Sequence, residues 1–93
     1  MKKYPADFCP KTRRQLLFRE MDDGAVVYEA GTEKVHTLNP SAAYIWALCN
    51  GNYNVQQIST QIRRDFASLD AHPEEEVQNI LASFDHLGLL ENS

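Results

Sequence analysis

The chain has 93 residues and a formal net charge of −4, with 43% hydrophobic and 24% charged residues. A chain of this length forms one domain around one modest core. It contains no apolar run near the ~18 residues that a membrane-spanning helix needs. The basic N-terminus is not followed by the apolar stretch of a secretory signal, so the sequence predicts a cytoplasmic protein.

Basic side chains gather at the start of the chain. Residues 1–19 hold six lysines and arginines against Asp7 alone, whereas the remainder carries the acidic excess. The sequence therefore predicts a flexible basic segment over residues 1–14, followed by the folded domain over residues 15–91. Such a segment is either merely solvated or a contact for a partner protein or nucleic acid.

Three short strands are expected next. Residues 15–20 and 25–29 are rich in Leu, Val, Phe and Tyr, and the Asp-Gly pair at positions 23 and 24 favours a hairpin turn between them. A second turn over residues 30–33 leads to a third strand over residues 34–38. These strands form a small antiparallel meander.

The first helix is bounded by clear signals. Asn39 can cap it, Pro40 suits its first position, and Gly51 supplies the left-handed residue expected at its end. Between these signals the spacing of three and four residues places one set of side chains on the buried face: Ala42, Ile45, Trp46 and Cys49.

Two further helices complete the fold. The second is predicted over residues 55–66 behind an Asn54 cap, with Val55, Ile58, Ile62 and Phe66 inside and Gln57, Gln61 and Arg64 outside. The third begins at Pro73 behind His72 or Asp70, places three glutamates at the positive end of the helix dipole, and ends at Gly88. Its apolar side consists of Val77, Ile80, Leu81, Phe84 and Leu87.

The sequence offers no catalytic, metal or cofactor site. The three histidines have no cysteine or carboxylate at ligand spacing, and the four glycines are scattered singly rather than gathered in a phosphate-binding loop. Cys9 and Cys49 lie forty residues apart and are expected to be ordinary reduced thiols. We therefore expect no enzyme activity, no bound metal and no cofactor.

Two features exceed what a core requires. If the meander order holds, the third strand is a sheet edge, whose unpaired backbone groups can accept another chain. The apolar side of the third helix is also wide, so Ile80 and Leu87 could flank a groove while Val77, Leu81 and Phe84 pack inward. The alternative is that all five belong to the core.

The first helix also carries a family resemblance. Its residues resemble the signature of the PqqD-like proteins, which are also described as RiPP recognition elements. The matching positions are Leu38-Asn39, Ser41, Ala42, Ile45-Trp46, Leu48 and Asn50-Gly51. The resemblance continues into the second helix, the third helix and the closing segment of the family. The matching positions there are residues 55–58, Val77, Ile80-Leu81, Phe84 and residues 88–90. Asn50 stands where the family more often has Asp, and the N-terminal segment matches poorly.

The resemblance implies an α+β, winged-helix-like fold with a three-stranded antiparallel N-terminal sheet followed by three α-helices. It also implies a non-enzymatic peptide chaperone, which takes the leader of a ribosomally made precursor as an added strand between the third strand and the third helix. The expected partners are that precursor and a modifying enzyme such as a radical SAM or ATP-dependent maturase. The expected peptide-binding residues are Lys34, Val35, His36, Thr37, Leu38, Val77, Asn79, Ile80, Ser83, Phe84 and Leu87.

Two other functions fit the same elements. A winged-helix DNA-binding regulator is the main alternative, but the third helix offers glutamates and no Lys or Arg to the phosphates. Only Arg63, Arg64 and the basic segment could assist. A structural subunit bound or fused to a larger enzyme would show the same features with its edge permanently occupied.

Overall fold

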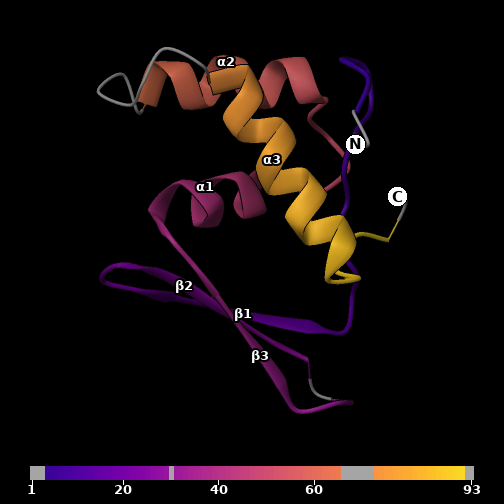
Figure 1. Ribbon diagram of the computed structural model, residues 1–93, viewed down its shortest axis with the longest axis vertical. Helices are drawn as coiled ribbons and strands as arrows, with labels where there is room; N and C mark the ends of the chain where they lie inside the picture. The colour runs from indigo at the N-terminus through magenta and orange to yellow at the C-terminus, as the bar shows by residue number, and fades with distance from the viewer. Residues whose placement is uncertain (1–3, 30, 66–72, 92–93) are drawn as a thin grey trace.

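The computed structural model describes residues 4–29, 31–65 and 73–91. Three strands precede three helices, and Figure 1 shows all three helices on the same side of the sheet. The elements are β1 (Leu16–Met21), β2 (Gly24–Glu29), β3 (Lys34–Leu38), α1 (Pro40–Leu48), α2 (Val55–Asp65) and α3 (Pro73–His86). The strands form one antiparallel sheet in the order β1-β2-β3. The predicted α+β, winged-helix-like fold is confirmed.

The β1–β2 turn differs in detail from the expected Asp-Gly turn. Asp22 and Asp23 form the two-residue connection, and Met21 pairs with Gly24, which has already entered β2. Gly24 takes a φ of +139°, and a Cβ built there would lie 2.0 Å from the carbonyl oxygen of Leu38. The glycine is therefore required by the close approach of the end of β3.

Helix α1 begins as predicted and ends earlier than predicted. The Asn39 side chain accepts a 2.8 Å hydrogen bond from the Ala42 N–H, and Pro40 occupies the first turn. The helix ends at Leu48, with Cys49 as its C-cap, so Gly51 lies beyond the helix end. Gly51 does have a left-handed φ of +85°, and its N–H donates to the Pro10 carbonyl. Gly51 therefore serves a hydrogen bond to the N-terminal segment, whereas Cys49 caps the helix.

Helices α2 and α3 also carry specific end signals. Asn54 and Gln57 exchange two 2.8 Å hydrogen bonds between side chain and backbone, which forms a capping box at the start of α2. The predicted Phe66, and the His72 and Asp70 caps, lie outside the described residues. At the other end of α3, Gly88 takes a φ of +75° after the helix has ended at His86. Leu87 therefore lies just past the helix rather than within it.

The core is a single cluster that includes Trp46. The Trp46 ring stacks on Phe18 of β1 at 6.0 Å and meets Phe84 of α3 edge-on at 5.3 Å. One indole thus connects the sheet to two helices. The predicted inner faces of α1 and α2 are confirmed over the described residues, because Ala42, Ile45, Trp46, Cys49, Val55, Ile58 and Ile62 are all buried.

The N-terminal segment does not behave as the flexible tail expected from its charge. Tyr4 is buried against the core at 4% exposure, and Phe8 packs partly against it. The Tyr4 hydroxyl donates a 2.7 Å hydrogen bond to Asp85, and its backbone exchanges two 2.8 Å bonds with the Gln78 side chain. The backbone of residues 6–12 also bonds to residues 49–56. Aromatic anchors and main-chain pairing outweigh the solvation of the intervening charges.

Candidate functional site

Strand β3 forms one edge of the sheet. It pairs with β2 from Ala25–Leu38 through Glu29–Lys34, and no strand among the described residues pairs with its other side. Figure 1 shows this edge running from the start of α1 to the far end of the sheet. The edge can therefore accept an added strand.

The free backbone groups of β3 follow from the adjacent turn. The Glu29 carbonyl accepts from the N–H groups of Thr32 and Glu33, at 3.3 and 2.8 Å, so it points toward β3. Because successive strand residues point their backbone groups to opposite sides, Lys34, His36 and Leu38 bond to β2. Val35 and Thr37 therefore present their N–H and C=O groups at the free edge.

The side chains of β3 divide between two faces. Leu38 is buried beside α1 and His36 is half-buried, so the set 34, 36 and 38 faces the helices. Val35 is 58% exposed and Thr37 is exposed on the opposite face. The two residues with free backbone groups thus direct their side chains away from the helices.

A small ionic cluster lies at one end of the helix-facing side. His36 Nε2 lies 2.6 Å from a carboxylate oxygen of Glu29, and Arg13 donates to the same carboxylate at 3.0 Å. The hydrogen bond to His36, with the positive charges of Arg13 and Lys34, holds the pKa of Glu29 below its usual value. The contact with Glu29 holds the ring of His36, which the sequence analysis had placed among the expected peptide-binding residues.

Helix α3 divides the other predicted residues into core and surface. Val77 and Phe84 are 0% and 2% exposed, so they belong to the core. Ile80 is partly buried against the same core, whereas Leu87 is 43% exposed. Asn79 and Ser83 are exposed. The inward packing predicted for Val77, Leu81 and Phe84 is confirmed.

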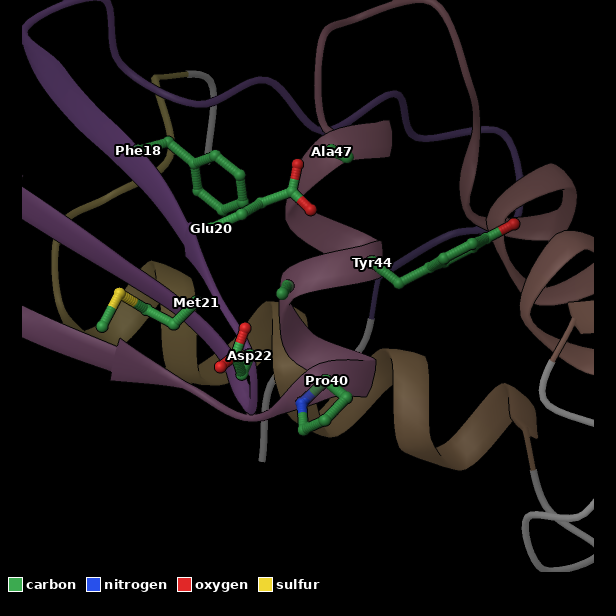
Figure 2. A pocket seen from close by; sticks show the side chains of 9 residues that line it. Phe18, Glu20, Met21, Asp22, Pro40, Tyr44 and Ala47 are labelled. Carbon is green, nitrogen blue, oxygen red and sulfur yellow. The ribbon is translucent and has the colours of Figure 1, made fainter.

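Sequence reasoning missed a hollow beside the other edge strand of the sheet. A cavity of about 310 Å³ lies between β1 and α1. Figure 2 shows Phe18 and Glu20 extending from β1 toward α1, where Ala47 and Tyr44 lie. The apolar run of residues 15–20 indicated a strand, but only the sheet order reveals β1 as the second edge.

The described residues offer little catalytic chemistry. Residues 4–29, 31–65 and 73–91 contain no group of three His, Cys, Asp or Glu side chains that could hold a metal ion. Burial raises the pKa of the Cys49 thiol to about 12, which opposes formation of a nucleophilic thiolate. Across the same residues, no helix is long and apolar enough to cross a membrane.

The comparisons agree with this fold. The chain is similar to a solved structure described as TbiB1 in complex with the TbiA(beta) leader peptide, with 21% identity and a TM-score of 0.76 over 89% of this chain and 96% of that one. A likeness to Streptococcus suis SuiB bound to S-adenosylmethionine has 15% identity and a TM-score of 0.47, over 86% of this chain and 22% of SuiB. No curated protein matches significantly. The family model for coenzyme PQQ synthesis protein D (PqqD) matches residues 24–90, which is more than half of the chain, and the chain therefore belongs to the PqqD family.

Proposed function

We propose that this protein is a non-enzymatic peptide chaperone that binds the leader of a ribosomally made precursor peptide. Three observations support the proposal: membership of the PqqD family, the likeness to TbiB1 in its leader complex, and the unpaired edge of β3. The edge carries most weight, because it supplies backbone donors and acceptors in a fixed direction. The leader adds to the sheet as a fourth strand beside β3.

In the proposed complex, the backbone groups of Val35 and Thr37 set the register of the leader. Apolar leader side chains contact Ile80 and Leu87, which are the two apolar residues of the expected set on α3 and its end that keep exposed surface. Asn79 and Ser83 are exposed and available for polar contacts. The remaining expected residues have supporting places: Leu38, Val77 and Phe84 lie in the core, His36 is held by Glu29, and Lys34 is exposed at the strand end.

The second proposed partner is a modifying enzyme that acts on the core segment of the precursor peptide. A radical SAM or ATP-dependent maturase fits this role. We assign the chemistry to that enzyme, because this chain belongs to a family whose proposed role here is peptide binding. The bound leader raises the local concentration of the precursor at the enzyme.

Thr37→Pro provides the test of leader binding. Proline removes the N–H that faces the free edge, while its φ is compatible with an edge strand. Thr37→Val is the matched control, since it keeps the N–H and the branched side chain. We expect Thr37→Pro to stay folded and to lose at least tenfold in affinity for a synthetic peptide with the sequence of the cognate leader, measured by calorimetry, while Thr37→Val binds normally.

Equal affinity of both variants would contradict strand addition at β3. The DNA-binding alternative is tested with the same protein, by fluorescence anisotropy at about 150 mM salt. The first turn of α3 carries Glu74, Glu75 and Glu76, which would repel phosphates, so we expect no sequence-specific complex. A sub-micromolar, sequence-specific complex would replace the leader-binding proposal.

A further inference from the structure

Lys34 begins strand β3, the edge at which the leader is proposed to add. After residue 19 the sequence has three basic side chains, Lys34, Arg63 and Arg64, against twelve acidic ones. Arg63 forms an ion pair with Glu74, and Arg64 forms one with Asp65. Lys34 is exposed and has no ion pair with any residue that the structure describes. Within that part of the chain it is an unpaired positive charge in an acidic domain.

The neighbouring carboxylate does not cancel this charge. Glu29 lies directly opposite Lys34 on β2, but one of its oxygens accepts from Arg13 at 3.0 Å and the other lies 2.6 Å from His36 Nε2. Glu33 precedes Lys34 in the turn, and among the described residues no ion pair joins these two. The single negative charge of Glu29 thus faces the positive charges of both Arg13 and Lys34, which leaves a positive excess at this end of β3.

The Lys34 side chain lies on the face of the sheet that the helices cover. It shares this face with His36 and Leu38, because alternate strand residues point the same way. In an added strand, the residue opposite Lys34 also points to this face, with its Cβ about 5 Å from that of Lys34. An acidic side chain at that position pairs with the ammonium group. A lysine or arginine there meets a like charge, which destabilises the strand pair.

The start of α3 lies beside the other end of β3. The Ser41 hydroxyl donates a 3.3 Å hydrogen bond to Glu76, in the first turn of α3, and Ser41 follows β3 closely, because β3 ends at Leu38. Ile80 comes one turn after Glu76 on the same side of α3. The apolar surface that Ile80 offers therefore belongs to the Leu38 end of the edge.

The end of α3 lies beside the Lys34 end of β3. The Leu89 carbonyl, just past α3, accepts a 3.0 Å hydrogen bond from the backbone N–H of Arg13. The side chain of Arg13 bonds to Glu29, the cross-strand neighbour of Lys34. Helix α3 therefore runs along β3 in the opposite direction. The two ends of the edge differ in chemistry, with apolar surface at one end and positive charge at the other.

We propose that the leader carries an aspartate or glutamate opposite Lys34 and an apolar residue two or four positions away, opposite His36 or Leu38. This inference rests on the proposed addition of the leader at β3. In an antiparallel leader strand the apolar residue precedes the acidic one, whereas in a parallel strand it follows, so the order also reports the strand direction. Lys34 is exposed, so salt weakens this selection by screening the pair.

The test uses dye-labelled synthetic peptides with the sequence of the cognate leader, in which one residue at a time is changed to glutamate or to lysine. Their affinity for the full chain is measured by fluorescence anisotropy at about 50 mM salt, where screening is weak. We expect one position at which the glutamate peptide binds about fivefold more tightly than the lysine peptide. Two or four residues to one side of it, both substitutions should weaken binding, because that position is apolar.

Lys34→Glu should reverse the preference at the acidic position. Arg19→Glu is the matched control, since it makes the same charge change on an exposed residue of β1 and should leave the preference as in the parent. If Lys34→Glu lowers the melting temperature, Lys34→Gln replaces it, and the preference then disappears rather than reverses.

The outcomes separate this inference from leader binding itself. Peptides that bind but show no position whose preference depends on Lys34 would contradict the inference and leave leader binding intact. An equal response to Arg19→Glu would do the same, because the effect would then come from net charge. A cognate leader that does not bind the parent protein at all would contradict both proposals.

Discussion

The two edge strands of this sheet differ in the side chains that accompany their unpaired backbone groups. Both β1 and β3 carry unpaired backbone groups at alternate residues, but the accompanying side chains lie on opposite faces. On β3 the side chains of Val35 and Thr37 point away from the helices, whereas on β1 Phe18 points inward and stacks on Trp46. Whether the residues with unpaired backbone groups point their side chains toward or away from the helices therefore depends on a shift of one residue along the strand.

The two edges share one core, and its loss should affect both. Trp46→Ala removes the indole that contacts Phe18 and Phe84. We expect a loss of about 3–5 kcal/mol in unfolding free energy, which can unfold so small a domain. Urea unfolding followed by circular dichroism measures it. A variant with the parent midpoint would show that Trp46 does not connect the sheet to the helices.

Proline scanning along β3 sharpens the distinction between inward and outward backbone groups. His36→Pro removes an N–H that bonds to β2 and also the imidazole that contacts Glu29, so we expect a loss of about 3 kcal/mol or more. Thr37→Pro, one residue away, should melt close to the parent. Equal melting temperatures for the two variants, read by calorimetry, would mean that the alternation assigned to β3 is wrong.

Substitutions beside the two edges should show which edge binds the leader. Leu87→Asp places a charge near the proposed leader site on an exposed residue, so the fold should survive while leader affinity falls about tenfold. Ile80→Asp should lower affinity as well, but with a stability cost, because Ile80 packs partly against the core. Met21→Asp, on β1, is the control. Loss of leader affinity in Met21→Asp would transfer the site to the other edge.

The smallest expected effect is a pH dependence at the end of β3. The pKa of Glu29 is lowered in the folded protein, chiefly by its hydrogen bond with His36, so its contribution to stability is present above the ordinary carboxyl value of 4.5 and is lost as the pH falls through the lower folded pKa. We expect the melting-temperature difference between the parent and Glu29→Gln to be constant just above pH 4.5 and to shrink below it. A difference that grows on acidification would contradict this sign.

Much of the fold could be predicted because local signals agree with tertiary packing. Asn39, Pro40 and the spacing of Ala42, Ile45 and Trp46 specify α1 without reference to the rest of the chain. The third strand was predicted with the bounds observed for β3. The earlier end of α1 was not predicted. Gly51 donates a hydrogen bond to Pro10 instead of ending the helix, and a contact between distant segments leaves no pattern in the local sequence.

The candidate site was predictable only in outline. Helical spacing placed Val77 and Phe84 inward and Ile80 and Leu87 beside a possible groove, and the structure does place Val77 and Phe84 in the core. The packing of Tyr4 against Asp85 and Gln78 was not predicted, because the basic residues around Tyr4 indicated a solvated segment. The hollow beside β1 depends on the sheet order, which no single strand specifies.

The most direct test of leader addition at β3 is an amide chemical-shift map of the isotope-labelled protein on titration with the synthetic leader. We expect the largest changes at residues 34–38 and 77–87, with slowed hydrogen exchange at the Val35 and Thr37 amides, since these two gain partners at the free edge. Residues 16–21 of β1 and the helix α2 should change little. Changes centred on β1 or α2, with Val35 and Thr37 unaffected, would contradict the account.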